Sequence, residues 1–269
     1  MRRNLNREQL LMLVFAPALF LILVFFLSLR LPSRHIPVPT PTPDFGPLPD
    51  FTAMADVRSM KAAFFDYLHP IVSFHNDRLL QQRAELLALR SAIAEEKSLS
   101  DAEGDWLREL TLHYELDCDA STASVCLDRL LRRADIIPLE LTLVQAAKES
   151  GWGRSRFAIK ANNLFGQWCY KSGCGLVPHL RPEEMKHEIA EFPSIDDAIR
   201  RYMLNLNTHE RYQLLRQLRA DLRAEGKPID GLALADGLLY YSQRREPYID
   251  ELKSMIIQYR DFEATRRGP

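Results

Sequence analysis

Residues 144–168 read VQAAKESGWGRSRFAIKANNLFGQW, and this stretch decides how the C-terminal half of the chain folds. Just before it, Pro138 suits the first turn of a helix that is expected to run to about Glu149. Gly151 then ends the helix, and Trp152 follows where its ring can cover the Glu149 carboxylate. One face of this helix is expected to pack inward, and it carries Leu139, Thr142, Leu143, Ala146 and Ala147.

Glu149 is expected where a carboxylate is electrostatically disfavoured. The C-terminal end of a helix carries partial negative charge, which disfavours a carboxylate by roughly 0.3–1 kcal/mol and raises its pKa. Partial burial beside Trp152 would raise the pKa further. A general acid at neutral pH needs such a pKa, so Glu149 is a candidate acid catalyst. The alternative is a solvated glutamate with no role beyond the helix end.

The same stretch resembles the glucosaminidase domain of glycoside hydrolase family 73. That family's pattern is approximately QAALESGWG, then a serine, an alanine and NLFG. This chain has QAAKESGWG from Gln145 and NLFG from Asn163, with Ser155 and Ala158 between them. The resemblance extends over about residues 138–260. Looser similarity continues at Phe192, Ser194, Ala198, Tyr202, Tyr241 and Tyr248.

The resemblance implies a mainly α, lysozyme-like helical glucosaminidase domain over 138–262, with a small irregular or β-hairpin region. It implies an endo-β-N-acetylglucosaminidase that cuts peptidoglycan glycan strands, with Glu149 as general acid. The family's second carboxylate usually lies on a hairpin after NLFG. Here that region holds Glu183, Glu184, Glu188 and Glu191, and Glu188 is preferred because it precedes Phe192. The opposite face of the sugar would be served either by this carboxylate or by the substrate's own N-acetyl group.

Aromatic side chains in this region are candidates for sugar-facing surfaces, although each is equally at home in a core. Trp168 and Tyr241 are the preferred candidates. Asn163 would bind either the sugar or its own turn. The other aromatic candidates are Trp152, Tyr202 and, least favoured, Phe165.

The N-terminus predicts a membrane anchor. Residues 10–29 form an uncharged apolar run of 20 residues, long enough for one membrane-spanning helix. Arginines on both sides give only a slight bias toward a cytoplasmic N-terminus, with the rest periplasmic at the inner membrane. A cleaved signal peptide is the main alternative, but its apolar core is normally shorter. The predicted division is a tip and anchor over 1–31 and a linker over 32–49.

The linker holds seven of the 16 prolines and would extend about 50 Å as polyproline. A helical region is then expected over 50–137, with helices at 52–68, 71–97 and 122–134 and a capping box at Ser100 and Glu103. Helices are expected again at 194–206, 208–224, 230–241 and 246–260, after an irregular 151–193 with a possible hairpin near 176–192.

Four cysteines in two close pairs, Cys118 with Cys126 and Cys169 with Cys174, fit disulfides in an oxidising compartment. Four reduced thiols are the alternative. No zinc-type motif occurs, so neither a metal nor another cofactor is expected. With a net charge of -1 and no basic block, nucleic-acid binding is not expected either.

Two other functions compete with the glucosaminidase. A lytic transglycosylase has a similar fold but usually carries Gly-Ala-x-Gly-Leu-Met-Gln after the glutamate, which NNLFG does not match. A non-catalytic peptidoglycan-binding or scaffold protein would use the 52–134 helices to contact other proteins, such as those of the cell-wall machinery, and the C-terminal domain only to hold glycan.

Overall fold

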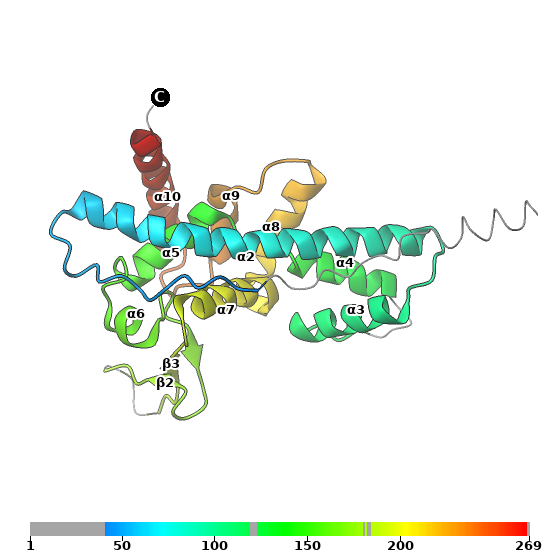
Figure 1. Ribbon diagram of the computed structural model, residues 1–269, viewed down its shortest axis with the longest axis horizontal. Coiled ribbons are helices and arrows are strands. Elements are labelled where there is room, and N and C mark those ends of the chain that lie inside the picture. Colours follow the sequence, from blue (N-terminus) through cyan, green and yellow to red (C-terminus); the bar gives the residue numbers. More distant parts are fainter. Residues whose placement is uncertain (1–40, 119–122, 180, 182–183, 268–269) are drawn as a thin grey trace, which may run out of the picture. The chain divides into compact units, whose positions relative to one another are not determined.

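The computed structural model describes residues 41–118, 123–179, 181 and 184–267. Helices dominate the described residues, together with a small antiparallel sheet (Figure 1). The α-helices are α2 (Val57–Ala94), α3 (Asp101–His113), α4 (Ala123–Arg133), α5 (Leu139–Ser150), α6 (Arg156–Ala161), α7 (Ile195–Thr208), α8 (Gln213–Ala224), α9 (Gly231–Ala235) and α10 (Glu246–Arg267). Short 3-10 turns are η2 (Glu210–Tyr212) and η3 (Asp236–Leu238).

The main core forms where the first half of α2 packs with α5, α7 and α10 (Figure 1). Phe64 and Leu68 of α2 are fully buried here, beside Leu143 of α5 and Leu252 of α10. The apolar face predicted for the 138–149 helix is thus the face that packs inward. The first half of α2 belongs to the same core as the glucosaminidase-like residues.

Helix α2 is continuous, so the predicted division into helices at 52–68 and 71–97 was wrong. The helix continues through Pro70, which lacks an N–H and whose ring crowds the preceding turn. On both sides of it, however, Leu68, Ile71 and Val72 are fully buried in the main core. This packing offsets the lost hydrogen bond and keeps the helix intact.

A second cluster, here called the distal core, joins the other half of α2 to α3 and α4. Leu86 of α2 and Leu127 and Leu130 of α4 are fully buried in it. The Cys118–Cys126 disulfide lies beside this cluster, as the sequence predicted. The predicted capping box at the start of α3 is also present, with Ser100 and Glu103 as its members.

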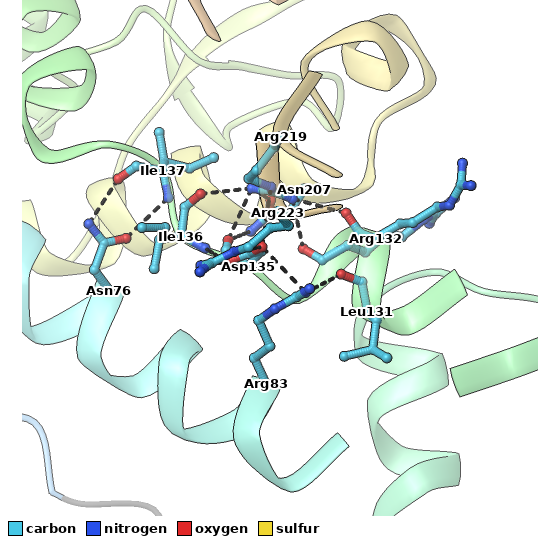
Figure 2. Close-up of polar contacts among 11 residues, drawn as sticks. Asn76, Arg83, Leu131, Arg132, Asp135, Ile136, Ile137, Asn207, Arg219 and Arg223 are labelled. Atoms are coloured by element: carbon cyan, nitrogen blue, oxygen red, sulfur yellow. Dashed lines mark hydrogen bonds and ion pairs between the residues drawn. The ribbon is translucent and has the colours of Figure 1, made fainter. Parts of the chain in front are cut away.

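A buried ionic joint connects α2, the α4–α5 loop and α8 (Figure 2). Asp135 accepts from Arg223 at 2.8 Å and lies 3.3 Å from a nitrogen of Arg83. Arg219, almost fully buried, donates to the Asp135 carbonyl at 3.1 Å and to the Arg132 carbonyl at 3.0 Å. Burial raises the pKa of Asp135, but the Arg223 hydrogen bond and the neighbouring guanidinium charges outweigh it and lower the pKa. The joint therefore fixes the loop that leads into α5.

The sheet consists of β1 (Trp168–Cys169), β2 (Gly175–Leu176) and β3 (Glu188–Ala190), in the order β1-β3-β2. The Cys169–Cys174 disulfide closes the loop between β1 and β2, again as predicted. Gly175 is required, because a Cβ there would lie 1.9 Å from the Ile189 carbonyl oxygen. The hairpin predicted near 176–192 is thus present as β2 and β3, and it begins at Gly175. Helix α6, in the region predicted to be irregular, was not predicted.

The remaining helix predictions hold with shifted ends. The 208–224 helix begins only at Gln213, after η2, and the 230–241 helix stops at Ala235 and continues as η3. In the part of the chain that the structure describes, no helix is both long and apolar enough to cross a membrane. The predicted anchor over 10–29 and most of the proline-rich linker lie outside the described residues.

Candidate active site

Helix α5 ends in a tight turn directly after Glu149. Residues 151–153 all adopt left-handed backbone conformations, with φ angles of 58°, 63° and 74°. The Ser150 hydroxyl accepts from the Gly153 N–H at 2.7 Å and donates to the carbonyl one turn earlier. Gly153 leaves no room for a side chain, because a Cβ would lie 2.7 Å from a ring carbon of Phe51. The turn that exposes one side of Glu149 is therefore fixed by the main core.

The Glu149 carboxyl is half-buried and is bound by a tyrosine. Tyr248 of α10 donates its hydroxyl to Glu149 Oε1 at 2.8 Å. Gln145, one turn earlier on α5, donates its amide to the same hydroxyl at 2.9 Å. Tyr202 of α7 in turn donates to the Gln145 carbonyl oxygen. Three helices therefore position a single carboxyl group.

Burial raises the pKa of Glu149, and the Tyr248 hydrogen bond and the Lys148 charge only partly counter that rise. The direction agrees with the prediction from the sequence, and burial is its largest cause. The group is a carboxyl that keeps its proton to a higher pH than an ordinary glutamate and is oriented by the Tyr248 hydroxyl. Such a group can deliver a proton at a pH where an ordinary glutamate is already ionised.

A row of aromatic rings joins the acid to the NLFG turn. Tyr241 stacks on Tyr248 with ring centroids 5.6 Å apart, and its hydroxyl donates to the Phe165 carbonyl at 3.0 Å. Phe165 stacks on Tyr202 at 3.9 Å. Tyr202 is only 1% exposed, so its ring supports Gln145 and offers almost no surface to a sugar. Tyr241 is half-buried and keeps some accessible surface.

Asn163 supports its own turn, which is one of the two roles considered for it. Its amide nitrogen donates to the Gln167 carbonyl at 2.9 Å and to the Ala190 carbonyl at 2.8 Å. Its side-chain oxygen accepts from the Gln167 N–H at 3.0 Å. The side chain is 1% exposed and uses its hydrogen-bonding capacity inside the protein.

Glu188, the predicted second carboxylate, lies on β3 and is buried against the disulfide loop. Its two oxygens accept from the N–H groups of Gly173 at 3.0 Å and Gly175 at 2.9 Å. These backbone hydrogen bonds lower the pKa of Glu188. This geometry favours a structural role for the carboxylate, and its catalytic role stays a prediction. Glu184 and Glu191 are exposed, and Glu183 lies outside the described residues.

Trp168 is the most accessible of the predicted sugar-facing rings. It lies on β1, is 49% exposed, and stacks on His187 with centroids 3.9 Å apart. Trp152, in contrast, packs edge-on against Phe64 at 5.6 Å and Phe65 at 5.2 Å, two side chains of α2. The contacts of the Trp152 ring thus place it mainly in the core. A flat exposed ring such as Trp168 is the kind of surface on which sugars stack.

Two features beside Glu149 were not predicted from the sequence. Tyr248 was recognised as part of the resemblance but not as the partner of the acid, 99 positions away. Lys148 forms an ion pair of 2.5 Å with Glu251 of α10, and Glu251 also accepts from Arg244 at 3.0 Å. A signal for the first was available, because Gln145 and Glu149 lie one turn apart on the same edge of the predicted helix.

One group of side chains has the spacing of metal ligands within the described residues, and it comprises Cys169, Cys174 and Glu188. The two sulfur atoms are bonded to each other and are not thiolates, which are the form that binds metals. Both remaining acceptor atoms of Glu188 are engaged by backbone N–H groups. The donor set therefore does not suit a metal in this oxidised state.

A helical scaffold that presents a half-buried carboxyl with a raised pKa, and an exposed aromatic ring on the hairpin of the same domain, fits a glycosidase-type enzyme. Comparison with known proteins agrees with this class. Residues 126–261 match the Glucosaminidase family model, described as mannosyl-glycoprotein endo-beta-N-acetylglucosaminidase. The chain belongs to this family.

The chain is also 30% identical over 208 residues to Protein bax of Escherichia coli (strain K12), covering 77% of this chain and 73% of that protein. The family match includes Glu149 and the residues that position it, Gln145, Tyr202 and Tyr248. No solved structure matches the chain, so the lysozyme-like character of the fold stays a prediction.

Proposed function

We propose that this chain is a peptidoglycan hydrolase that cleaves N-acetylglucosaminyl bonds of glycan strands, with Glu149 as the general acid. Family membership supports the glycosidase class, and the sequence pattern around Glu149 supports the choice of bond. The observation that carries the proposal is the environment of Glu149, which is half-buried and bound by the neutral Tyr248 hydroxyl. Burial raises the pKa of Glu149, which is the direction that a general acid needs.

In this mechanism Glu149 protonates the glycosidic oxygen while the bond to the anomeric carbon breaks. Positive charge then develops on the sugar ring in an oxocarbenium-like transition state. Tyr248 and Gln145 hold the carboxyl at one angle, so the proton is delivered along a fixed direction. The Tyr241 ring, stacked on Tyr248, and the exposed Trp168 ring provide surfaces for neighbouring sugars.

The opposite face of the sugar needs either a water-activating carboxylate or the substrate's N-acetyl group. Glu188 is ionised and accepts two backbone hydrogen bonds, so it is better suited to holding the hairpin than to accepting a proton. We therefore favour assistance by the N-acetyl group, with retention at the anomeric carbon. Inversion of that carbon, read from the anomeric form of the first product, would instead favour a carboxylate base.

The test is digestion of purified peptidoglycan by the full chain and by its Glu149→Gln variant. Products are identified by reducing-end labelling and by mass. We expect N-acetylglucosamine reducing ends from the wild type only, with Glu109→Gln, an exposed glutamate on α3, as the matched control that retains activity. Anhydro ends would show a lytic transglycosylase. Binding without cleavage would show a glycan-binding protein instead of an enzyme.

The location that fits this substrate is the periplasmic face of the inner membrane. The apolar run at 10–29 would anchor the chain, and the proline-rich residues 32–49 would hold the domain away from the bilayer. Both disulfides fit an oxidising compartment. Membrane fractionation and N-terminal peptide mapping test the anchor, since a mature chain that begins after residue 31 would contradict it.

A further inference from the structure

A lysine precedes the acid in the sequence and lies close to it in space. Lys148 is 19% exposed at its side chain, and its Nζ lies 5.5 Å from the centroid of the Tyr248 ring. The hydroxyl of that same tyrosine donates to Glu149. The Tyr248 side chain therefore contacts the Lys148 ammonium through its ring and the proposed acid, Glu149, through its hydroxyl.

An unpaired cation in this place would work against a general acid. A nearby positive charge stabilises the ionised carboxylate, and the charge of Lys148 already opposes the rise that burial gives to the pKa of Glu149. The flexible lysine stem would allow the ammonium to approach Glu149 more closely if nothing held it.

Glu251 of α10 holds the ammonium. Its Oε2 lies 2.5 Å from Lys148 Nζ, and Oε2 also accepts from Arg244 at 3.0 Å, while Oε1 accepts from the other terminal nitrogen of Arg244. The hydrogen bonds from Arg244 and from Lys148 lower the pKa of Glu251 to about 2. Glu251 is thus ionised at every pH at which Glu149 titrates.

We propose that Glu251 is a positioning residue for the acid, which binds and neutralises the Lys148 ammonium and so preserves the proton on Glu149. The catalytic purpose of this arrangement rests on the proposed function. The effect of Glu251 on the titration of Glu149 does not depend on that function. Arg244 anchors Glu251 in the correct place. Together, Lys148, Glu251 and Arg244 form what we call the lysine clamp.

The other groups around Glu149 do not replace the clamp. Tyr248 on α10, Tyr202 on α7 and Tyr241 before α10 face the carboxyl, and burial keeps all three hydroxyls neutral by raising their pKa values. Lys61 of α2 lies 4.7 Å from the Trp152 ring, on the other side of the turn. At the opposite end of α5, Glu140 is paired with Arg260, which is paired in turn with Asp230 beside α9.

The experiment is an NMR titration of the full chain labelled with glutamate that carries carbon-13 in its side-chain carboxyl. The Glu149→Gln variant identifies the Glu149 signal. In Glu251→Gln we expect the Glu149 titration midpoint to fall by about half to one pH unit, because one negative charge is lost and one cation is released near the carboxyl.

Two further variants separate electrostatics from a loosened fold. Glu251→Gln combined with Lys148→Leu, the residue of the family pattern, should return the midpoint to the wild-type value or above it. Asp236→Asn is the matched control, because it breaks a 2.6 Å ion pair with Lys253, which lies on α10 as Glu251 does. This variant should leave the Glu149 midpoint unchanged. An unchanged or raised midpoint in Glu251→Gln overturns the inference, and so does a double variant that keeps the lowered midpoint.

The titration needs no substrate, so its result is distinguishable from that of the digestion. A chain that leaves peptidoglycan intact contradicts the proposed function, whereas a shifted Glu149 midpoint in the same chain still supports the clamp. If the chain cleaves, the alkaline limb of its pH–rate profile should move to lower pH in Glu251→Gln and return in the double variant.

Discussion

The end of α5 and the disulfide hairpin each hold a buried carboxylate, and the two are held in opposite ways. Glu149 receives one hydrogen bond from a side-chain hydroxyl, and burial raises its pKa. Glu188 receives two hydrogen bonds from backbone N–H groups, which lower its pKa. The comparison shows that burial alone does not make an acid. At Glu149 burial outweighs the single hydroxyl hydrogen bond and raises the pKa, whereas at Glu188 the two backbone hydrogen bonds outweigh burial and lower it.

The largest expected difference between the two regions is catalytic. Glu149→Gln removes the proton donor and should reduce the rate of glycan cleavage by about 10²–10⁴-fold. Glu188→Gln should retain most of the rate, because the hairpin can keep one of its two hydrogen bonds. Rates of reducing-end release from the same peptidoglycan check both. A loss of similar size in Glu188→Gln would restore it as the second catalytic carboxylate.

The next effect concerns the hairpin alone. Replacing Cys169 and Cys174 by serine should lower the free energy of unfolding by about 2 kcal/mol, because the unfolded chain regains the freedom of a short loop. The midpoint of the Glu188 titration should also rise as the Gly173 and Gly175 N–H groups become less fixed. Thermal unfolding and a carboxyl titration measure the two effects. The Glu149 midpoint should not move, and a shift there would show that the two regions are coupled.

A smaller change in the cleavage rate is expected when the hydrogen bond to Glu149 is removed. Tyr248→Phe removes the hydroxyl that donates to Glu149 and should cost about 1 kcal/mol of transition-state stabilisation, or about fivefold in rate. Because that hydrogen bond lowers the pKa of Glu149, the pKa should rise in the variant. The pH–rate profile distinguishes this from simple misfolding, since its alkaline limb should move to higher pH.

The smallest expected effect is on the free energy of unfolding as a function of pH. The contributions of Glu149 and Glu188 to this free energy should change in opposite directions as the pH rises. A raised folded-state pKa means that Glu149 binds its proton more tightly when folded, so its contribution lowers stability as pH rises through the folded pKa. A lowered pKa means that Glu188 stabilises the fold above its unfolded pKa and loses this contribution as pH falls.

Melting temperatures of the two glutamine variants test these signs. At about pH 7.5, Glu149→Gln should melt above the wild type and Glu188→Gln below it. Both differences should shrink as the pH falls and the two carboxyl groups become protonated in the folded and unfolded states. Differences of the same sign at neutral pH would contradict the contrast between the two regions.

Local signals predicted the end of α5 and the starts of several helices well. The glycines after Glu149, the apolar face of α5 and the capping residues Ser100 and Ser194 act within a few positions of the features that they specify, so they can be read from the sequence. The direction of the Glu149 pKa follows from the same stretch.

The other parts of the site depend on residues that are distant in the sequence. Tyr248 meets Glu149 across 99 positions, and Arg219 meets Asp135 across 84. Glu188 was expected to serve catalysis because it is an acid near the right motif, but its backbone partners depend on how the loop closes. The continuity of α2 was missed for a similar reason, since the local penalty of Pro70 is offset by packing from α5 and α7.

The long helix α2 also determines what can be removed from this protein. The family match begins at residue 126, yet Phe64, Leu68 and Ile71 of α2 fill the core on which α5 rests. Residues 126–261 thus match the family model, but they lack the α2 side chains that complete their hydrophobic core. A fragment cut at that boundary would expose the apolar side of α5, whereas the segment from 41 onward carries its own core. In this protein the family domain depends on a helix that precedes it.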